Sequence, residues 1–307
     1  MPVSSPELHA ARRKQEAARW SLAASGTLLG LKIVVGSVTG SAGILAEAVN
    51  SAADLVGSAL AMLSVQASDE PPDHSHAYGH GKIENLSGAA TAALILVGGA
   101  FAIGEAVRHL LHPNPLPGVG WGIGVMGASA VVNLVVCRRL LRVGRETDSP
   151  ALAADGHHLQ TDVITSLGVL LGLTLVHLTG RIWWDSVAAL GVSFLILRVG
   201  FGLAAEAVLT LSDAALPPEE EAALTAILTA HSGVRGFHKL RSRKSGSHRH
   251  VDVHVQIADT HTFVEAHRLT EGLEDQLREV LPNLHPIIHI EPYEDEVRHQ
   301  QEQQNEI

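Results

Sequence analysis

The chain has 307 residues, of which 46% are hydrophobic, and its formal net charge is −10. This acidic balance, without a basic patch, argues against nucleic acid as a partner. The mean hydropathy of +0.18 is high for a soluble protein, although the C-terminal end is polar. We therefore predict a membrane domain followed by a soluble domain. The single cysteine, Cys137, excludes an intrachain disulfide and a cysteine-rich metal site.

Six apolar runs predict six transmembrane helices, because each is close to or longer than the roughly 20 residues that span a bilayer. The runs are Trp20–Ser37, Gly43–Ser64, Leu86–Val107, Val119–Cys137, Ala151–Leu178 and Trp183–Leu211. Arginine and lysine gather before the first run and between the fourth and fifth, as in cytoplasmic loops. We expect both termini to be cytoplasmic, and no cleavable signal peptide is predicted.

After Ser212 the hydropathy falls, and the pattern predicts a small α+β domain. Its expected elements are a helix over Pro217–His231, strands over Gly236–Arg243 and His250–Ile257, a helix over Thr262–Leu281 and a strand over His285–Glu291. The second helix has an apolar stripe at helical spacing: Ala266, Leu269, Leu273, Leu277 and Val280. The predicted domain bounds are 1–17 for a cytoplasmic N-terminal segment, 18–212 for the membrane domain, 213–293 for the soluble domain and 294–307 for a disordered tail.

Two aspartates, Asp54 and Asp162, lie inside the apolar runs. An ionisable group in hydrocarbon is costly, so such residues usually face a partner, an ion or a cavity. Asn50 precedes Asp54 by four residues and His158 precedes Asp162 by four, and residues at this spacing share one face of a helix. The four side chains predict one metal site between two helices. Their donor types suit Zn²⁺, with Mn²⁺, Fe²⁺, Co²⁺, Ni²⁺ and Cd²⁺ as further candidates.

Histidine is abundant, with 19 residues, and it is concentrated in two other regions. Between the second and third runs, Asp73, His76 and His80 lie in a glycine-containing loop that can fold around a cation. A polar cytoplasmic turn is the alternative explanation.

The soluble domain has a second concentration, in which His248, His250, Asp252 and His254 alternate with valines. Because a strand has a period of two, these polar residues share one face of the sheet. His289 and Glu291 repeat the pattern on the last strand, and His267 lies beside the apolar stripe of the second helix. We predict a metal-binding face, with a merely solvated sheet face as the alternative.

Three segments carry a resemblance to a known family, and their residues lie in its order and spacing. They are Ser41–Asp54, His76–Glu84 and Ala154–Asp162. With the soluble-domain histidines, they resemble the cation diffusion facilitators, and the chain is similar to the bacterial zinc/proton antiporter branch.

This resemblance implies a homodimer in the inner membrane that exchanges cytoplasmic metal for external protons, and not an enzyme. It also implies a ferredoxin-like soluble domain. It places the transport site on Asn50, Asp54, His158 and Asp162, and a loop site on Asp73, His76 and His80. A cytoplasmic binuclear site falls on His238, His254, His267, His289 and Glu291.

Asn50 departs from the zinc-transporting pattern, which has Asp or His at this position. Asparagine here resembles manganese-transporting relatives, but these pair it with a carboxylate where this chain has His158. Zn²⁺ remains the first expected cargo. The alternative function is a membrane-anchored metal sensor or scaffold with a vestigial transport site. A membrane metallohydrolase is disfavoured, because the chain has no His-Glu-x-x-His helix.

Overall fold

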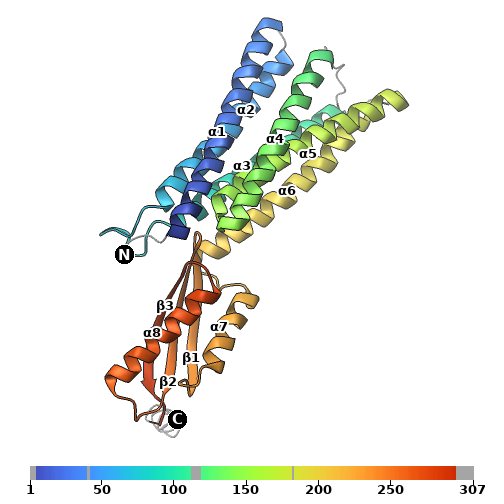
Figure 1. Ribbon diagram of the computed structural model, residues 1–307. Helices are drawn as coiled ribbons and strands as arrows, with labels where there is room; N and C mark the ends of the chain where they lie inside the picture. The colour runs from blue at the N-terminus through green and yellow to red at the C-terminus, as the bar shows by residue number, and fades with distance from the viewer. Residues whose placement is uncertain (1–4, 40–41, 112–118, 182, 295–307) are drawn as a thin grey trace. The chain divides into compact units, whose positions relative to one another are not determined.

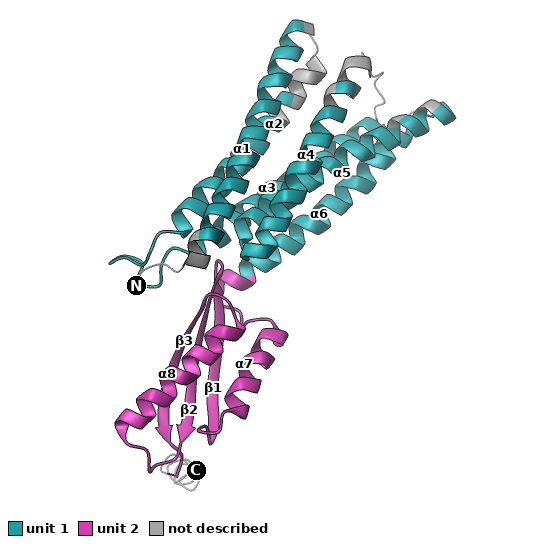
Figure 2. Ribbon diagram, in the orientation of Figure 1, with its two compact units in different colours: residues 1–208 teal, residues 209–307 magenta. Residues whose placement is uncertain are grey.

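The computed structural model describes residues 5–39, 42–111, 119–181 and 183–294 (Figure 1). The chain divides into two compact units, Met1–Val208 and Leu209–Ile307, and each is described by itself (Figure 2). The side chain of Asn50 and the expected tail from residue 295 onward lie outside the described residues. The domain bounds expected from the sequence therefore remain predictions.

The first unit is a bundle of long helices. They are α1 (Ser5–Thr39), α2 (Ala42–Ser68), α3 (Lys82–Leu111), α4 (Val119–Thr147), α5 (Pro150–Thr179) and α6 (Trp183–Leu211). The main packing pairs are α1 with α2 and α4 with α5, while α3 and α2 both contact α5. This last arrangement brings the segments that carry Asp54 and His158 together.

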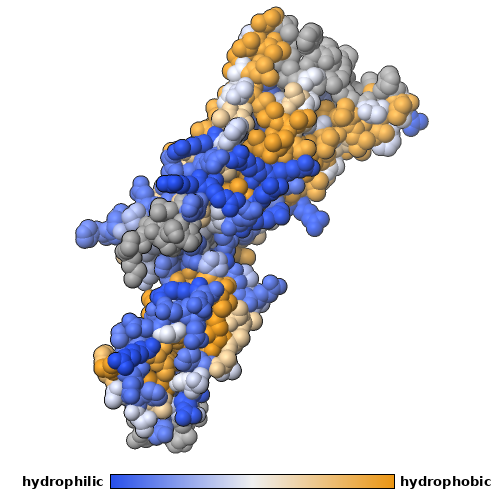
Figure 3. Space-filling model, viewed as in Figure 1, coloured by the Kyte–Doolittle hydropathy of each residue, from blue (hydrophilic) through white to orange (hydrophobic). Residues whose placement is uncertain are grey.

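Apolar side chains cover much of the visible surface of this bundle (Figure 3). Val38, Val97 and Phe101 are 70–83% exposed, which suits contact with lipid rather than with water. Among the described residues, four segments are long and apolar enough to cross a membrane: His9–Val38, Lys82–Leu111, Pro150–Val176 and Ser186–Leu211. The unit is thus a helical membrane domain, and the crossing of all six helices remains a prediction.

A buried polar network joins four helices at the end of the bundle that holds the α2–α3 loop. Lys14 Nζ of α1 lies 2.9 Å from Glu84 Oε1 of α3 and 2.7 Å from Asp69 Oδ1, just after α2. Ser68 donates to the same oxygen of Glu84 at 2.7 Å, and Ser149, the N-cap of α5, donates to the other. Lys14, one of the basic residues before the first apolar run, therefore also has a structural role.

The second unit contains a three-stranded sheet and two helices. The elements are α7 (Pro218–Ala230), β1 (Gly236–Ser245), β2 (His248–Ile257), α8 (Phe263–Val280) and β3 (Leu284–Pro292). The sheet order is β1-β2-β3; β1 and β2 are antiparallel, whereas β2 and β3 are parallel and connected through α8. The elements expected from the sequence are confirmed, with bounds that differ by at most two residues.

The core of this unit forms between one face of the sheet and the two helices. Val251, Val253 and Val255 of β2 are buried against Leu273 and Leu277 of α8. Val280, expected in the apolar stripe, is 48% exposed, and Leu281 is buried instead, because α8 ends at Val280 and the chain turns inward. A complete ferredoxin-like fold has four strands in the order βαββαβ. The described sheet has three, so that assignment remains a prediction.

Candidate metal centres

The membrane candidate site joins α2 and α5. One ligand atom from each of Asp54, His158 and Asp162 lies within 4.8 Å of the others. His158 Nε2 is 3.3 Å from Asp54 Oδ1, and the side chains of these two residues are only 11% and 13% exposed. His158 and Asp162 share a face because they are one helical turn apart on α5. Three of the four expected residues therefore converge, and Asn50 lies outside the residues whose side chains are described.

Asp155 lies next to this site on α5 and links α5 to two other helices. No role was predicted for it from the sequence. Its carboxylate is fully buried and accepts hydrogen bonds from Ser21 Oγ at 2.7 Å and Ser58 Oγ at 3.3 Å. These serines belong to α1 and α2, so Asp155 connects α5 to both helices. A signal was present in the sequence, since an aspartate three residues before His158 inside an apolar run needs a partner.

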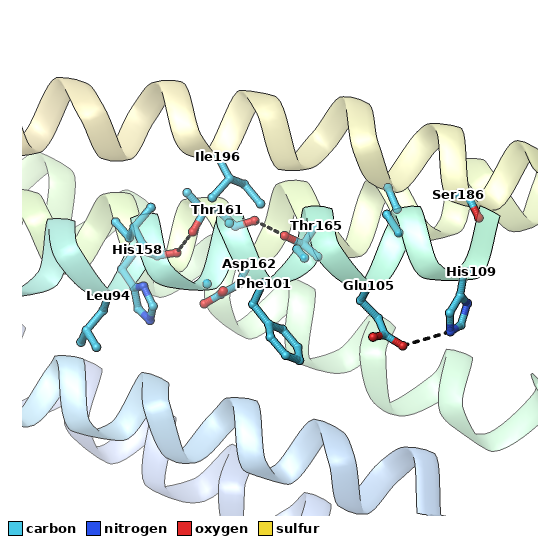
Figure 4. Close-up of a pocket in the computed structure, with 16 residues that line it drawn as sticks. Leu94, Phe101, Glu105, His109, His158, Thr161, Asp162, Thr165, Ser186 and Ile196 are labelled. Carbon is cyan, nitrogen blue, oxygen red and sulfur yellow. Dashed lines mark hydrogen bonds and ion pairs between the residues drawn. The ribbon is translucent and has the colours of Figure 1, made fainter. Parts of the chain in front are cut away.

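A cavity of about 410 Å³ opens beside His158 and Asp162, between α3, α5 and α6. Figure 4 shows these two residues toward one end of the lining and Glu105 with His109 toward the other. Glu105 Oε1 lies 3.2 Å from His109 Nε2, and Glu105 also pairs with Arg108. The cavity therefore offers space for an ion beside His158 and Asp162.

The loop between α2 and α3 gathers the second group: Asp73, His76 and His80. His76 Nδ1 and His80 Nε2 each lie 3.5 Å from an oxygen of Asp73. The Ser75 hydroxyl and the His76 backbone N–H donate hydrogen bonds to Asp73 and lower its pKa to about 2. Asp73 is therefore ionised at neutral pH and available as a ligand. The three expected loop residues come together, and their role as a metal site remains a prediction.

The sheet holds the third group: His238 of β1, His254 of β2 and Glu291 of β3. Glu291 lies between the two imidazoles, with Oε1 2.5 Å from His254 Nδ1 and Oε2 3.0 Å from His238 Nε2. Burial acts to raise the pKa of Glu291, but the hydrogen bond with His254 and the nearby His238 and His289 lower it below its ordinary value. The carboxylate is thus held in its charged form, which is the form that binds metal.

Two further residues expected in this group lie at its margin. The His289 ring is centred 4.6 Å from that of His254, and its Nε2 is 3.7 Å from Glu291 Oε1. The His267 side chain is 63% exposed and lies 3.5 Å from Glu271 on its own helix. Among the described residues, the compact group contains neither of them. Their participation requires side-chain rotation or a second chain and remains a prediction.

Comparisons with known proteins identify the family of the chain. The family model for the cation efflux transmembrane domain matches residues 18–212, and that for the cation efflux protein, cytoplasmic domain, matches residues 216–293. An uncharacterized transporter from Synechocystis is 36% identical over 90% of this chain and 89% of its own length. The cation-efflux pump FieF of Klebsiella pneumoniae is 34% identical over 92% and 93%. A solved structure of CzrB in its Zn form covers 25% of this chain and 90% of its own, with 32% identity and a TM-score of 0.25. The chain therefore belongs to the cation diffusion facilitators, a family of cation efflux transporters.

Proposed function

We propose that the protein exports a divalent transition-metal cation, Zn²⁺ first among the candidates, in exchange for protons across the inner membrane. One observation carries this proposal: Asp54, His158 and Asp162 converge to within 4.8 Å inside an apolar helical bundle. Two carboxylates and one imidazole can hold a dication that neutralises the carboxylates. The membership of the family supplies the efflux activity, while the cargo and the exchanged proton are our proposal.

The exchange follows from competition for the same lone pairs. A metal ligand must be deprotonated, so binding a cation releases protons and protonation releases the cation. His158 suits this role because imidazole gains and loses a proton near neutral pH more readily than other metal-binding side chains. When the site faces the cytoplasm, deprotonated ligands take up the ion. When it faces the outside, protons reach His158 and a carboxylate, and the ion leaves.

Ligand chemistry supports Zn²⁺ as the first candidate but leaves the wider set open. Imidazole with carboxylate is a common zinc environment, while a harder, oxygen-rich set suits Mn²⁺. Asn50 would add a neutral oxygen, which leaves His158 as the softest donor of the quartet. We propose that His158 biases selection toward Zn²⁺, Co²⁺, Ni²⁺ and Cd²⁺.

The C-terminal unit supports a homodimer with regulatory metal binding. Its sequence matches the cytoplasmic domain of cation efflux proteins, and it carries the His238, His254 and Glu291 group. A metal bound there shifts transport only by the difference in its affinity for the two conformational states. We also propose that both termini are cytoplasmic and that all six helices of the first unit cross the membrane.

Reconstitution in liposomes that contain a pH dye tests the transport proposal. Zn²⁺, Mn²⁺, Fe²⁺, Co²⁺, Ni²⁺ and Cd²⁺ are added separately to wild type and to Asp162→Ala. The matched control is Glu146→Gln, because Glu146 is a partly exposed carboxylate of α4 that pairs with Arg13 away from the cavity. We expect saturable, metal-driven proton flux in wild type and control, and none in Asp162→Ala.

Two results would contradict the proposal. Undiminished flux in Asp162→Ala would remove the assigned site. If wild type binds metal but shows no flux with any cation, the sensor or scaffold function is favoured instead.

A further inference from the structure

A second group of imidazoles lies on the same open face of the sheet, nearer its other end. It consists of His248 and His250 of β2 and His285 of β3. None of these residues belongs to the group of His238, His254 and Glu291. Their arrangement can be followed from the strand register.

The register places all three side chains together. His250 and His285 are direct partners across the parallel β2–β3 pair. His248 precedes His250 by two residues, so both side chains project from the same face of β2. The His285 ring is centred 5.2 Å from the ring of His248 and 5.2 Å from that of His250.

One distance is close to that in a metal site, while the three imidazoles do not yet place a nitrogen each within 4.8 Å of one another, so binding one ion requires side-chain rotation. His248 Nδ1 is 3.1 Å from His285 Nε2. Two nitrogens that bind one tetrahedral zinc, each at about 2.0–2.1 Å, are separated by about 3.3–3.4 Å. A hydrogen bond between two imidazoles accounts for this single distance equally well. It does not account for a third imidazole stacked on the second at an interplanar angle of 20°.

The surroundings allow a cation to bind. Arg243 faces His250 across the β1–β2 pair, but its Nη1 lies 3.3 Å from Asp213 Oδ1, which offsets its charge. Asp252, exposed and two residues after His250 on the same face, adds a negative charge. His285 is exposed, so water can reach the fourth position of a tetrahedral ion.

We infer that His248, His250 and His285 form a further transition-metal site, with Zn²⁺ or a similar imidazole-binding cation held by three nitrogens and one water. A pair of histidines separated by one residue on a strand, with a third across from them, supplies three ligands to one ion. His250 and His254 are four residues apart on β2, about 13 Å at 3.3 Å per residue. The two groups therefore hold separate ions.

The experiment counts ions on the full chain purified in detergent, stripped with a chelator and titrated with Zn²⁺ alone. Elemental analysis after desalting gives the ions per chain. We expect His285→Ala to lose one ion relative to wild type, while His261→Ala loses none. His261 is the matched control because it is an exposed histidine of the same unit, next to the Ala258 carbonyl. Glu291→Gln should weaken the binding of a different ion without changing the ion that His285→Ala removes, so that the two effects add in the double variant.

A second readout uses Co²⁺ in place of Zn²⁺, because its visible absorption reports tetrahedral nitrogen ligation. Subtracting the Co²⁺ spectrum of His285→Ala from that of wild type should leave the absorption bands of a tetrahedral Co²⁺ ion. His248→Ala should lose the same bands. Size-exclusion chromatography confirms that the variants are folded. Wild-type zinc stoichiometry in both His285→Ala and His248→Ala would overturn the inference, as would an equal loss in His261→Ala. Since neither readout uses flux, the result is independent of the transport proposal.

Discussion

The membrane site and the sheet site of His238, His254 and Glu291 use the same donor types in different surroundings. In the sheet, Glu291 forms a hydrogen bond with His254 at 2.5 Å, and its other carboxylate oxygen lies 3.0 Å from His238 Nε2, which has no hydrogen-bond partner among the described residues. In the membrane, His158 Nε2 and Asp54 Oδ1 are 3.3 Å apart beside a cavity, and neither ring nitrogen of His158 has a hydrogen-bond partner among the described residues. The sheet ligands are organised by their own contacts, which suits retention. The membrane residues are brought together by the packing of α2 against α5 rather than by hydrogen bonds to one another.

Asp54→Asn should break this comparison most strongly. The amide preserves the shape of the side chain but removes a charge from the dication site, so we expect metal-driven proton flux to be abolished. Zinc bound by the C-terminal unit should be unchanged in the same preparation, as measured by elemental analysis. Retained flux would show that Asp54 is not needed as an anion.

Asp155→Asn tests whether the membrane ligands depend on their supporting contacts. Asp155 positions α5 through Ser21 and Ser58 and is not itself among the converging ligands. Loss of such a supporting group commonly weakens metal affinity or activity about 10–100-fold. We expect an effect of this size on transport, including a raised KM for the metal. Unchanged kinetics would mean that helix packing alone orients His158.

Glu291→Gln tests the organisation of the sheet site. The carboxylate joins both imidazoles, and its replacement should weaken zinc binding there by about tenfold or more, equivalent to about 1.4 kcal/mol. Transport should persist, with an altered dependence on metal concentration. Isothermal titration of the full chain and flux in liposomes separate these effects. Complete loss of flux in a folded, dimeric variant would show that the two sites are not separable.

Thr262→Ala should have the smallest effect, because it acts on the helix behind the sheet. Thr262 and Glu265 form a capping box at the start of α8, and loss of a threonine cap typically costs about 1 kcal/mol. Protection of the first amides of α8 against hydrogen exchange should fall, while zinc stoichiometry stays constant. A loss of zinc in this variant would show that the first turn of α8 is needed to position the zinc-binding residues of the sheet.

The same capping box has a defined dependence on pH. Hydrogen bonds from the backbone and hydroxyl of Thr262 lower the pKa of Glu265 below its ordinary value of 4.5. Because the folded-state pKa is depressed, the stabilisation is complete above that ordinary value and is lost as pH falls through the lowered pKa. Protection factors of the α8 amides, corrected for intrinsic exchange, should therefore decrease on acidification below 4.5 in wild type but much less in Glu265→Gln.

The sequence predicted that His158 and Asp162 share one face of a helix because helical spacing is regular. His158 and Asp162 required only a count of four residues and the cost of a charge in hydrocarbon. The sheet site was harder, because its ligands depend on register between strands. His238 faces His254 just before an irregularity in the β1–β2 pairing, where Lys239 has a φ of 51°. Local patterns do not fix such a bulge, and His238 was indicated by family resemblance alone.

Other differences arose from tertiary packing. Asp155 is placed by hydrogen bonds from two other helices, which no local pattern reveals. Val280 fits the helical stripe but lies where α8 ends, and Leu281 fills the core from the following turn. The backbone of Asn50 is described as part of α2, but its side chain lies outside the described residues. The position of the Asn50 side chain therefore remains a prediction from spacing, as does metal binding by Asp54, His158 and Asp162.

The buried network of Lys14, Asp69, Glu84 and Ser149 has a mechanical consequence for transport. It joins α1, the end of α2, α3 and the start of α5, and removing one partner of a buried ion pair typically costs about 3–5 kcal/mol. A conformational change that occurs in every transport cycle is easier if these contacts stay intact. We expect the network to keep the helix ends that it joins close together during transport. The opposite ends of the helices, beyond His158 and Asp162, should therefore be displaced farther.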